Sequence, residues 1–112
     1  MVEQELVLNT FENIAREWHN KFKDRWTEKN AKIILTRMQR DIFPHIGNIP
    51  IREPKAPQLS DVASRIADRG ALDYAHRALQ YCSMVFRYAI ANGKTEHNIV
   101  ADLRGALPTA RV

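Results

Sequence analysis

The sequence has very little cysteine and no long apolar run, and these absences narrow the class of protein. A single cysteine, Cys82, cannot form an internal disulfide. No run of apolar residues approaches the roughly 20 that a membrane-spanning helix needs. The first residues, Met1 to Glu5, lack the basic-then-apolar order of a signal peptide. We therefore expect a cytoplasmic protein with no membrane partner.

Clusters of reactive side chains are also missing. The four histidines are scattered and do not have the spacing of metal ligands. There is no glycine-rich phosphate loop and no Cys-x-x-Cys pair. Cys82 falls on the apolar side of a predicted helix, which is typical of a small core residue. Because no nucleophile stands beside a base and an orienting group, the sequence predicts no catalytic site, no metal and no cofactor.

What the sequence does contain is an ordinary core and a surplus of basic residues. Apolar residues make up 45% of the 112 positions, which is enough for one domain with a real core. The 17 lysines and arginines outnumber the 13 acidic residues and give a net charge of +4. This surplus favours an anionic partner such as nucleic acid, but many solvated helical domains carry a similar charge.

Helical periodicity runs through most of the chain, so the expected fold is all-α: a compact orthogonal bundle of four main helices plus a short C-terminal helix. Thr10 and Thr27 suit the N-caps of the first two helices. Pro44 should end the second helix near Phe43, and Pro57 suits the first turn of the third. The first helix should run from the Thr10 cap to a break at Asp24-Arg25, and the second from the Thr27 cap to about residue 43. An extended connector over 45–54 follows. The third helix should begin near Pro57 and end at Gly70, the fourth should lie between Gly70 and Gly93, and the fifth should run from the Asn98 cap to about residue 106.

The longest predicted helix lies between Gly70 and Gly93 and has two different faces. The small apolar face allows close packing of neighbouring helices, and it consists of Ala71, Ala75, Ala78, Leu79, Cys82, Val85, Phe86 and Ala89. The opposite, polar face consists of Asp73, Arg77, Gln80, Met84 and Arg87. Its two arginines carry forked guanidinium groups that suit phosphates or base edges.

A second basic face lies on the helix predicted over 28–43, opposite its apolar stripe. It consists of Lys29, Lys32, Thr36, Arg37 and Arg40, with Ile33 among them. Two such helices can together form a surface that binds a DNA groove. Alternatively, both faces are simply the solvated sides of amphipathic helices, and periodicity leaves this open. Ile33 fits either contact with a thymine methyl group or packing against a neighbouring element.

Tyrosines recur every seven residues along the longest helix, at Tyr74, Tyr81 and Tyr88. This spacing favours a stripe at the edge of the core whose hydroxyl groups remain in water. The other interpretation is that Tyr74 or Tyr81, near Arg77, contacts a DNA phosphate.

A set of short pieces occurs in a fixed order over roughly residues 9 to 107. They are Thr10-Phe11 with Ala15 and Trp18, Trp26-Thr27 with Lys29-Asn30, Asp41 to Ile51, Ala56 to Leu59, Asp68 to Ala71, Ala75-His76-Arg77, Val85 to Gly93, and Asn98. The set resembles the core-binding domain of phage-type tyrosine recombinases, the integrases, and within them those that insert prophages or genomic islands near transfer-RNA genes. One departure is Asn98-Ile99-Val100, where the family usually has Asn-Pro-Ala.

The resemblance implies that this is the second of three domains in a modular enzyme. Its helical domain would span 9–107, after an N-terminal tail over 1–8 and before the start of a linker at 108–112. It would clamp double-stranded DNA at the attachment core site, and its first and last helices would contact other integrase subunits. The tyrosine nucleophile would lie in a catalytic domain outside this chain, so the chain itself is not expected to be an enzyme.

In the family, the second and fourth helices face the DNA. The expected DNA contacts are Lys29, Asn30, Lys32, Arg37, Arg40, His76, Arg77, Gln80 and Arg87. The alternative is a helical protein-interaction module without DNA binding, whose surface would be the apolar side of the first or last helix. A helix-turn-helix repressor fits less well, because a proline-rich connector takes the place of the tight turn.

Overall fold

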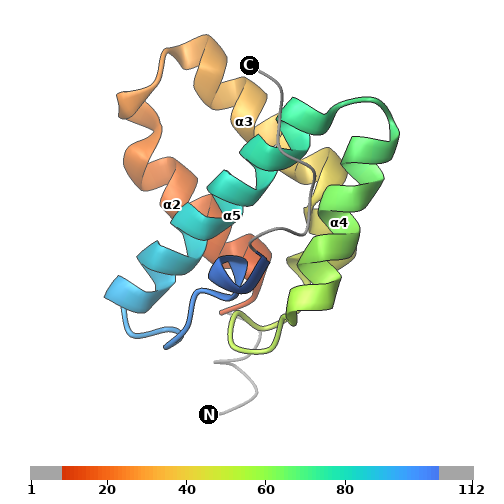
Figure 1. The fold of residues 1–112 in the computed structure, drawn as a ribbon. Coiled ribbons are helices and arrows are strands. Elements are labelled where there is room, and N and C mark those ends of the chain that lie inside the picture. The colour runs from red at the N-terminus through yellow and green to blue at the C-terminus, as the bar shows by residue number, and fades with distance from the viewer. Residues whose placement is uncertain (1–8, 104–112) are drawn as a thin grey trace.

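The computed structural model describes residues 9–103 and shows an all-α fold, as expected. The chain order is visible in Figure 1. The elements are α2 (Phe11–Phe22), the 3₁₀ turn η1 (Lys23–Arg25), α3 (Glu28–Asp41), the π-type turn η2 (Phe43–Gly47), α4 (Ala56–Asp68), α5 (Leu72–Ala91) and the 3₁₀ turn η3 (Ile99–Leu103). None of the helices in this part of the chain is long and apolar enough to cross a membrane.

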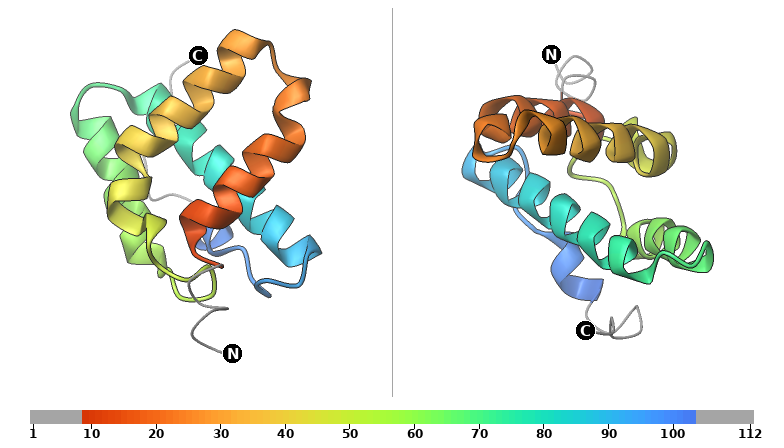
Figure 2. Two further views of the ribbon diagram at one scale, coloured as in Figure 1. Left: turned by 180° about the vertical axis from the view of Figure 1, so that it is seen from behind. Right: turned by 90° about the horizontal axis from the view of Figure 1, so that it is seen from above.

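The helices form two layers (Figure 2). One layer contains α2 and α3, joined through η1, and the other contains α4 and α5. The longest helix, α5, crosses over α2 rather than running parallel to it (Figure 1). As a result, α5 meets α3 near one end and the α2–η1 segment near the other.

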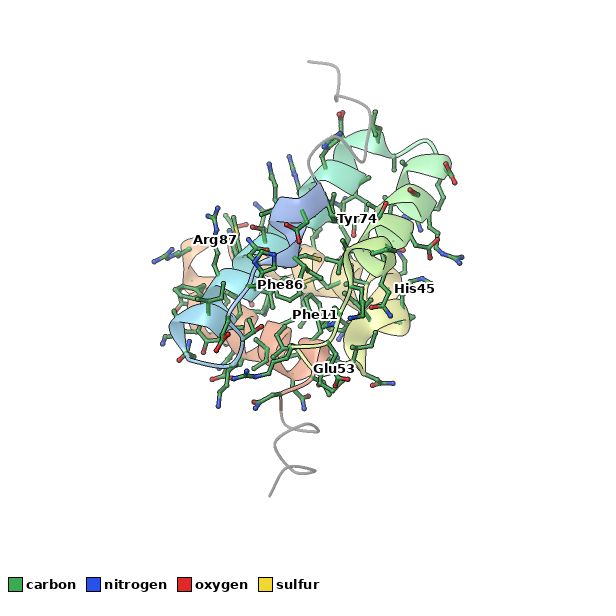
Figure 3. The ribbon with its side chains drawn as sticks, turned by 60° about the horizontal axis from the view of Figure 1, so that its bottom comes forward. Phe11, His45, Glu53, Tyr74, Phe86 and Arg87 are labelled. Carbon is green, nitrogen blue, oxygen red and sulfur yellow. The ribbon has the colours of Figure 1, made fainter. Side chains whose placement is uncertain are left out.

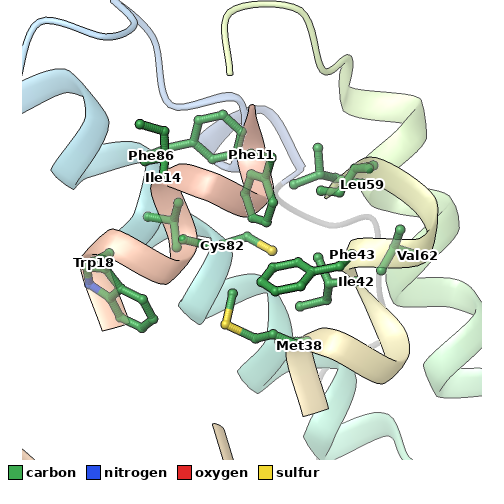
Figure 4. Close-up of a cluster of buried hydrophobic side chains, with 14 of the residues drawn as sticks. Phe11, Ile14, Trp18, Met38, Ile42, Phe43, Leu59, Val62, Cys82 and Phe86 are labelled. Atoms are coloured by element: carbon green, nitrogen blue, oxygen red, sulfur yellow. The ribbon is translucent and has the colours of Figure 1, made fainter. Parts of the chain in front are cut away.

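A single hydrophobic cluster fills the space between the layers (Figure 4). The Phe11 ring lies at its centre, 5.7 Å from the Phe86 ring and 6.3 Å from the Phe43 ring. The residues of α5 that are buried are Ala75, Ala78, Cys82, Val85, Phe86, Tyr88 and Ala89. The small apolar face predicted from the sequence is therefore the packed face, which leaves the polar face of α5 outside.

The ends of the main helices follow the local signals in the sequence. The Thr10 hydroxyl oxygen accepts a hydrogen bond from the Asn13 amide at 3.2 Å, and the Thr27 hydroxyl does the same for Asn30 at 3.1 Å. Both are N-caps, as predicted. Gly70 and Gly93 have φ values of 84° and 71°, a region that glycine enters without steric cost, and each follows a helix.

The connector after α3 differs from the prediction of an extended segment over 45–54. The α3 helix ends at Asp41, and η2 adds a further helical turn that contains Pro44. The backbone amides of His45 and Ile46 both donate to the carbonyl of Ile42 at 3.1 Å. This turn buries Phe43 and Ile46 in the core, and that burial outweighs the local tendency of Pro44 to end helical structure.

The predicted fifth helix is a 3₁₀ turn, η3, in the part of the chain that the structure describes. Asn98 caps it as expected, because its side-chain oxygen accepts from the Val100 amide at 3.1 Å. The same side chain donates to the Ser83 hydroxyl at 2.8 Å and so fixes the turn to α5. The expected helix end near residue 106, the tail over 1–8 and the linker over 108–112 lie outside the described residues.

Candidate nucleic-acid interface

The outer side of α3 carries the first group of predicted contacts. Four of them are exposed to solvent: Lys29, Asn30, Lys32 and Arg40. Arg37 is half-buried, because its guanidinium group lies over the Tyr74 ring of α5 at 4.8 Å from the ring centre. A basic side chain of α3 is thus held against α5.

The outer side of α5 carries the second group. Arg77, Gln80 and Arg87 are exposed, and His76 is half-buried. Figure 3 shows Phe86 beside Phe11 in the middle of the molecule and Arg87 at its edge, as expected for neighbours on opposite faces of one helix. The polar stripe predicted for α5 therefore faces solvent along most of the helix.

The two helices approach each other at the N-terminal end of α5. A hollow of about 190 Å³ lies there, lined by Arg37, Asp73, Tyr74 and Arg77. The structure therefore brings together two of the predicted arginines from different helices. Four other predicted contacts lie apart from this junction: Lys29, Asn30 and Lys32 on the N-terminal half of α3, and Arg87 near the C-terminal end of α5.

Asp41, the last residue of α3, holds two arginines in place beside this junction. Its carboxylate is buried and accepts hydrogen bonds from Arg69 at 2.8 and 3.2 Å and from Arg40 at 2.9 and 3.1 Å. The hydrogen bond from Arg69 is the main reason that the pKa of Asp41 lies well below its usual range; burial opposes this, and Arg40 adds to it. The carboxylate therefore stays ionised and orients two half-exposed arginines.

Arg69 was not among the residues predicted from the sequence. It follows α4 and contacts Asp41, 28 residues earlier in the sequence, so no local sequence pattern predicts the contact. With about half of its side chain exposed, Arg69 adds a positive group beside Arg40 at the end of α3. The guanidinium group of Arg40, a predicted DNA contact, already donates two hydrogen bonds to Asp41.

The three tyrosines of α5 have different surroundings. Burial, with the nearby Asp41 carboxylate adding, raises the pKa of Tyr74 to about 12. Tyr88 is buried, and its hydroxyl donates to a carboxylate oxygen of Glu17 at 3.0 Å. The Tyr88 hydroxyl thus lies at the edge of the core, where the exposed Glu17 of α2 supplies its acceptor. Tyr81 is half-buried beside Trp18, with ring centres 6.5 Å apart.

A second hollow, of about 400 Å³, lies at the other end of α5. Its lining is mostly apolar and comes from α2, from η1 with the Trp26 that follows it, and from α5: Trp18, Phe22, Arg25, Trp26, Met84, Arg87, Tyr88 and Ala91. The sequence did not predict it, because its lining residues come from separate elements that only the fold brings together. Arg87 thus lies beside an apolar surface, whereas Arg77 lies among charged groups.

Two further observations bear on chemistry. Within residues 9–103, no group of three or more histidine, cysteine, aspartate or glutamate side chains could hold a metal ion. Cys82 is fully enclosed, and burial raises the pKa of its thiol to about 12. A thiol in that state is a packing group, because the thiolate is the nucleophilic form.

Comparison with known proteins places this arrangement in a family. The model of the phage integrase central domain matches residues 11–106. The chain belongs to this family. It is 36% identical to the integrase of Shigella phage Sf6 over 99 residues, which cover 88% of this chain and 26% of that protein. It is 38% identical to the integrase of Enterobacteria phage P4 over 102 residues, or 91% and 23% of the two chains.

Solved structures agree with the fold of this integrase central domain. A fragment of the integrase IntS of E. coli, determined by NMR, is 36% identical and superposes with a TM-score of 0.83 over 88% of this chain and 84% of that fragment. The integrase-like domain from Bacillus cereus has a TM-score of 0.82 over 93% and 87% of the two chains. At 17% identity, it supports the fold alone. The chain spans about a quarter of the length of the phage relatives it matches.

Proposed function

We propose that this integrase central domain binds double-stranded DNA at a core recombination site and positions it for a catalytic domain of the full-length protein. The observation that carries the proposal is the junction of α3 and α5, where Arg37 and Arg77 line one hollow beside Tyr74. Guanidinium groups from two helices at one place suit consecutive phosphates of a DNA strand, because each can donate two hydrogen bonds to phosphate oxygens.

The other exposed side chains extend this surface along both helices. On α3 these are Lys29, Asn30, Lys32 and Arg40, and on α5 they are Gln80 and Arg87, with the half-buried His76 beside Arg77. Lysines would anchor phosphates, and the amides of Asn30 and Gln80 would donate to and accept from base edges. Because Asp41 already orients Arg40 and Arg69, these two arginines would lose less freedom when DNA binds.

We infer that the domain supplies affinity and positioning rather than chemistry. In the parent protein, a tyrosine recombinase, the nucleophile would come from the catalytic domain, and other integrase subunits would be the protein partners. The surroundings of the α5 tyrosines support this division. The Tyr88 hydroxyl is bound to Glu17, and the raised pKa of Tyr74 keeps its phenol protonated at neutral pH. Neither side chain is prepared to act as a nucleophile.

A charge-reversal titration tests the DNA surface. The affinity of the chain for a duplex that carries the attachment core would be measured at several salt concentrations for Arg77→Glu and Lys32→Glu. We expect each variant to bind about tenfold more weakly, with a shallower dependence of log affinity on log salt. Arg52→Glu is the matched control, because Arg52 is exposed in the connector, outside α3 and α5, and is not among the proposed contacts.

Unchanged affinity and unchanged salt dependence in both variants would refute the DNA surface. Sedimentation of the wild-type chain with and without duplex then distinguishes the alternative, a protein-interaction module. Such a module would self-associate or remain free of DNA, whereas the proposed domain would sediment as a monomer that shifts when the duplex is added.

A further inference from the structure

The polar stripe of α5 is interrupted by one large apolar side chain. Met84 is 44% exposed and lies between Gln80, four residues before it, and Arg87, three residues after it. Side chains at these spacings are neighbours on the surface of a helix. Within residues 9–103 the only other exposed large apolar side chain is Ile90, at 38%. Ile90 lies on a different side of α5, roughly 120° away around the helix axis.

Met84 also lines the larger hollow, which combines apolar side chains with two arginines. Trp18, Phe22 and Trp26 form the aromatic side of the hollow. Arg25 lies over the Phe22 ring at 4.6 Å, and Arg87 lines the hollow from α5. An apolar surface framed by two cations is complementary to a ligand that presents an apolar group between negative charges.

The major groove of DNA at an A·T base pair has this character. The C5-methyl group of thymine projects into the groove, and the phosphates of both strands run along its edges. An α-helix fits this groove, and a glutamine one helical turn from an apolar side chain can read an adenine nearby. We propose that Met84 determines specificity by contacting the C5-methyl group of a thymine, next to the base pair that Gln80 contacts.

This inference rests on the proposed function, because Met84 reaches a base only if the α5 stripe faces DNA. The stripe itself favours DNA over a protein ligand. Met84 continues the line of Arg77, Gln80 and Arg87, which belong to the proposed DNA surface. An acidic peptide from another protein is the competing occupant, and the experiment below separates the two.

The experiment uses duplexes that differ by single methyl groups. The wild-type 112-residue chain would first select duplexes from a random pool, and the enriched sequence would be determined. Each thymine of that sequence would then be replaced by deoxyuridine, which removes only the C5-methyl group. We expect one or two positions at which this replacement weakens wild-type binding by about fourfold, as loss of one buried methyl group implies.

The variants identify the side chain responsible. Met84→Ala should bind the thymine and deoxyuridine duplexes equally at those positions, and Met84→Leu should restore part of the difference. Ile90→Ala, the matched control, should keep the wild-type difference. Because Met84 is exposed and alanine is a strong helix former, the variant should fold, and circular dichroism checks this.

Several results would overturn the inference. One is an enriched sequence without thymine, and another is an equal deoxyuridine effect in wild type and Met84→Ala. If binding depends on Arg77 but shows no methyl effect, only this inference fails. If the wild-type chain binds no duplex, the proposed function fails as well.

Discussion

The two ends of α5 meet their neighbours by different physical means. At the N-terminal end, a buried carboxylate, Asp41, orients Arg40 and Arg69, and Arg37 stacks on Tyr74. At the C-terminal end, the aromatic rings of α2 and of Trp26, which follows η1, pack beside α5, and the Trp18 and Trp26 rings lie 5.5 Å apart. The proposed DNA surface is therefore held by charge at one end and by apolar packing at the other.

One helix, α5, can therefore present two kinds of contact surface, one charged and one apolar. Ion pairs orient the guanidinium groups that would bind phosphates, and their strength depends on pH and salt. Aromatic packing depends on neither, and it leaves an apolar surface that can touch base methyl groups. Substitutions at the two ends of α5 should therefore change stability or DNA affinity by different amounts. Their effects should also respond differently to pH and salt.

The largest effect is expected at the apolar end. Trp18 is almost fully buried and contacts the rings of Trp26 and Tyr81. Trp18→Ala removes a large side chain that the surrounding structure cannot replace, so the free energy of unfolding should fall by about 3 to 5 kcal/mol. Urea denaturation followed by circular dichroism measures this. The loss should be the same at pH 3 and pH 7, and a loss below about 1 kcal/mol would show that this end is not held by packing.

The next effect is expected at the charged end. Asp41→Asn keeps the shape of the side chain but removes the charge that Arg69 and Arg40 contact. The free energy of unfolding should fall by about 2 kcal/mol at pH 7, the usual size for hydrogen bonds to charged groups. Asp61→Asn is the matched control, because Asp61 pairs with Arg65 on the exposed side of α4. That substitution should cost about 0.5 kcal/mol or less.

The same pair of variants predicts a dependence on pH. Because folding lowers the pKa of Asp41, its contribution is complete above the unfolded-state pKa of about 3.9 and is lost as the pH falls below that value. The difference in stability between wild type and Asp41→Asn should therefore be constant from pH 7 to about 5 and shrink toward pH 2. A stability difference that does not change over this pH range would mean that the ionised carboxylate of Asp41 does not stabilise the fold.

A smaller effect, on the salt dependence of DNA affinity, distinguishes the two ends of α5. Arg77→Gln and Arg87→Gln each remove one cation without adding a negative charge. If each arginine contacts one phosphate, the slope of log affinity against log salt should become shallower by about 0.9 in each variant. The double variant should show about twice that change, because the sites are distant along α5. A change for Arg77→Gln alone would restrict the DNA surface to the charged end.

The smallest effect concerns Tyr88. Tyr88→Phe removes the hydroxyl that donates to Glu17 while keeping the ring that Phe22 packs against, with ring centres 6.0 Å apart. The free energy of unfolding should fall by about 1 kcal/mol. Affinity for DNA should not change, because the hydroxyl faces α2. Weaker DNA binding by this variant would show that Tyr88 belongs to the interface after all.

The parts of the fold predicted from the sequence are those that depend on neighbouring residues. The Thr10 and Thr27 caps and the glycines that end α4 and α5 act within one helical turn, so the sequence displays them directly. The small apolar face of α5 is also local, because it follows from a period of 3.6 residues. The basic faces of α3 and α5 were predicted for the same reason.

The features that were missed depend on distant pairs. Arg69 meets Asp41 across 28 positions and Tyr88 meets Glu17 across 71, and no spacing rule connects such residues. The last part of η2, residues 45–47, was expected to be extended because Pro44 dominates the local pattern. The burial of Phe43 and Ile46 decides otherwise, and burial depends on the whole fold. The hollow beside Met84 exists only because α2, η1 and α5 meet there.

The most direct test of the proposed DNA surface is an NMR titration of the isotopically labelled chain with a core-site duplex. We expect the largest changes in amide chemical shift along the outer faces of α3 and α5, at Lys29, Lys32, Arg37, Arg77, Gln80 and Met84. Amides of α4 and of the connector at Arg52 and Glu53 should change little. Changes concentrated on α4 or the connector, with α3 and α5 unaffected, would contradict the account.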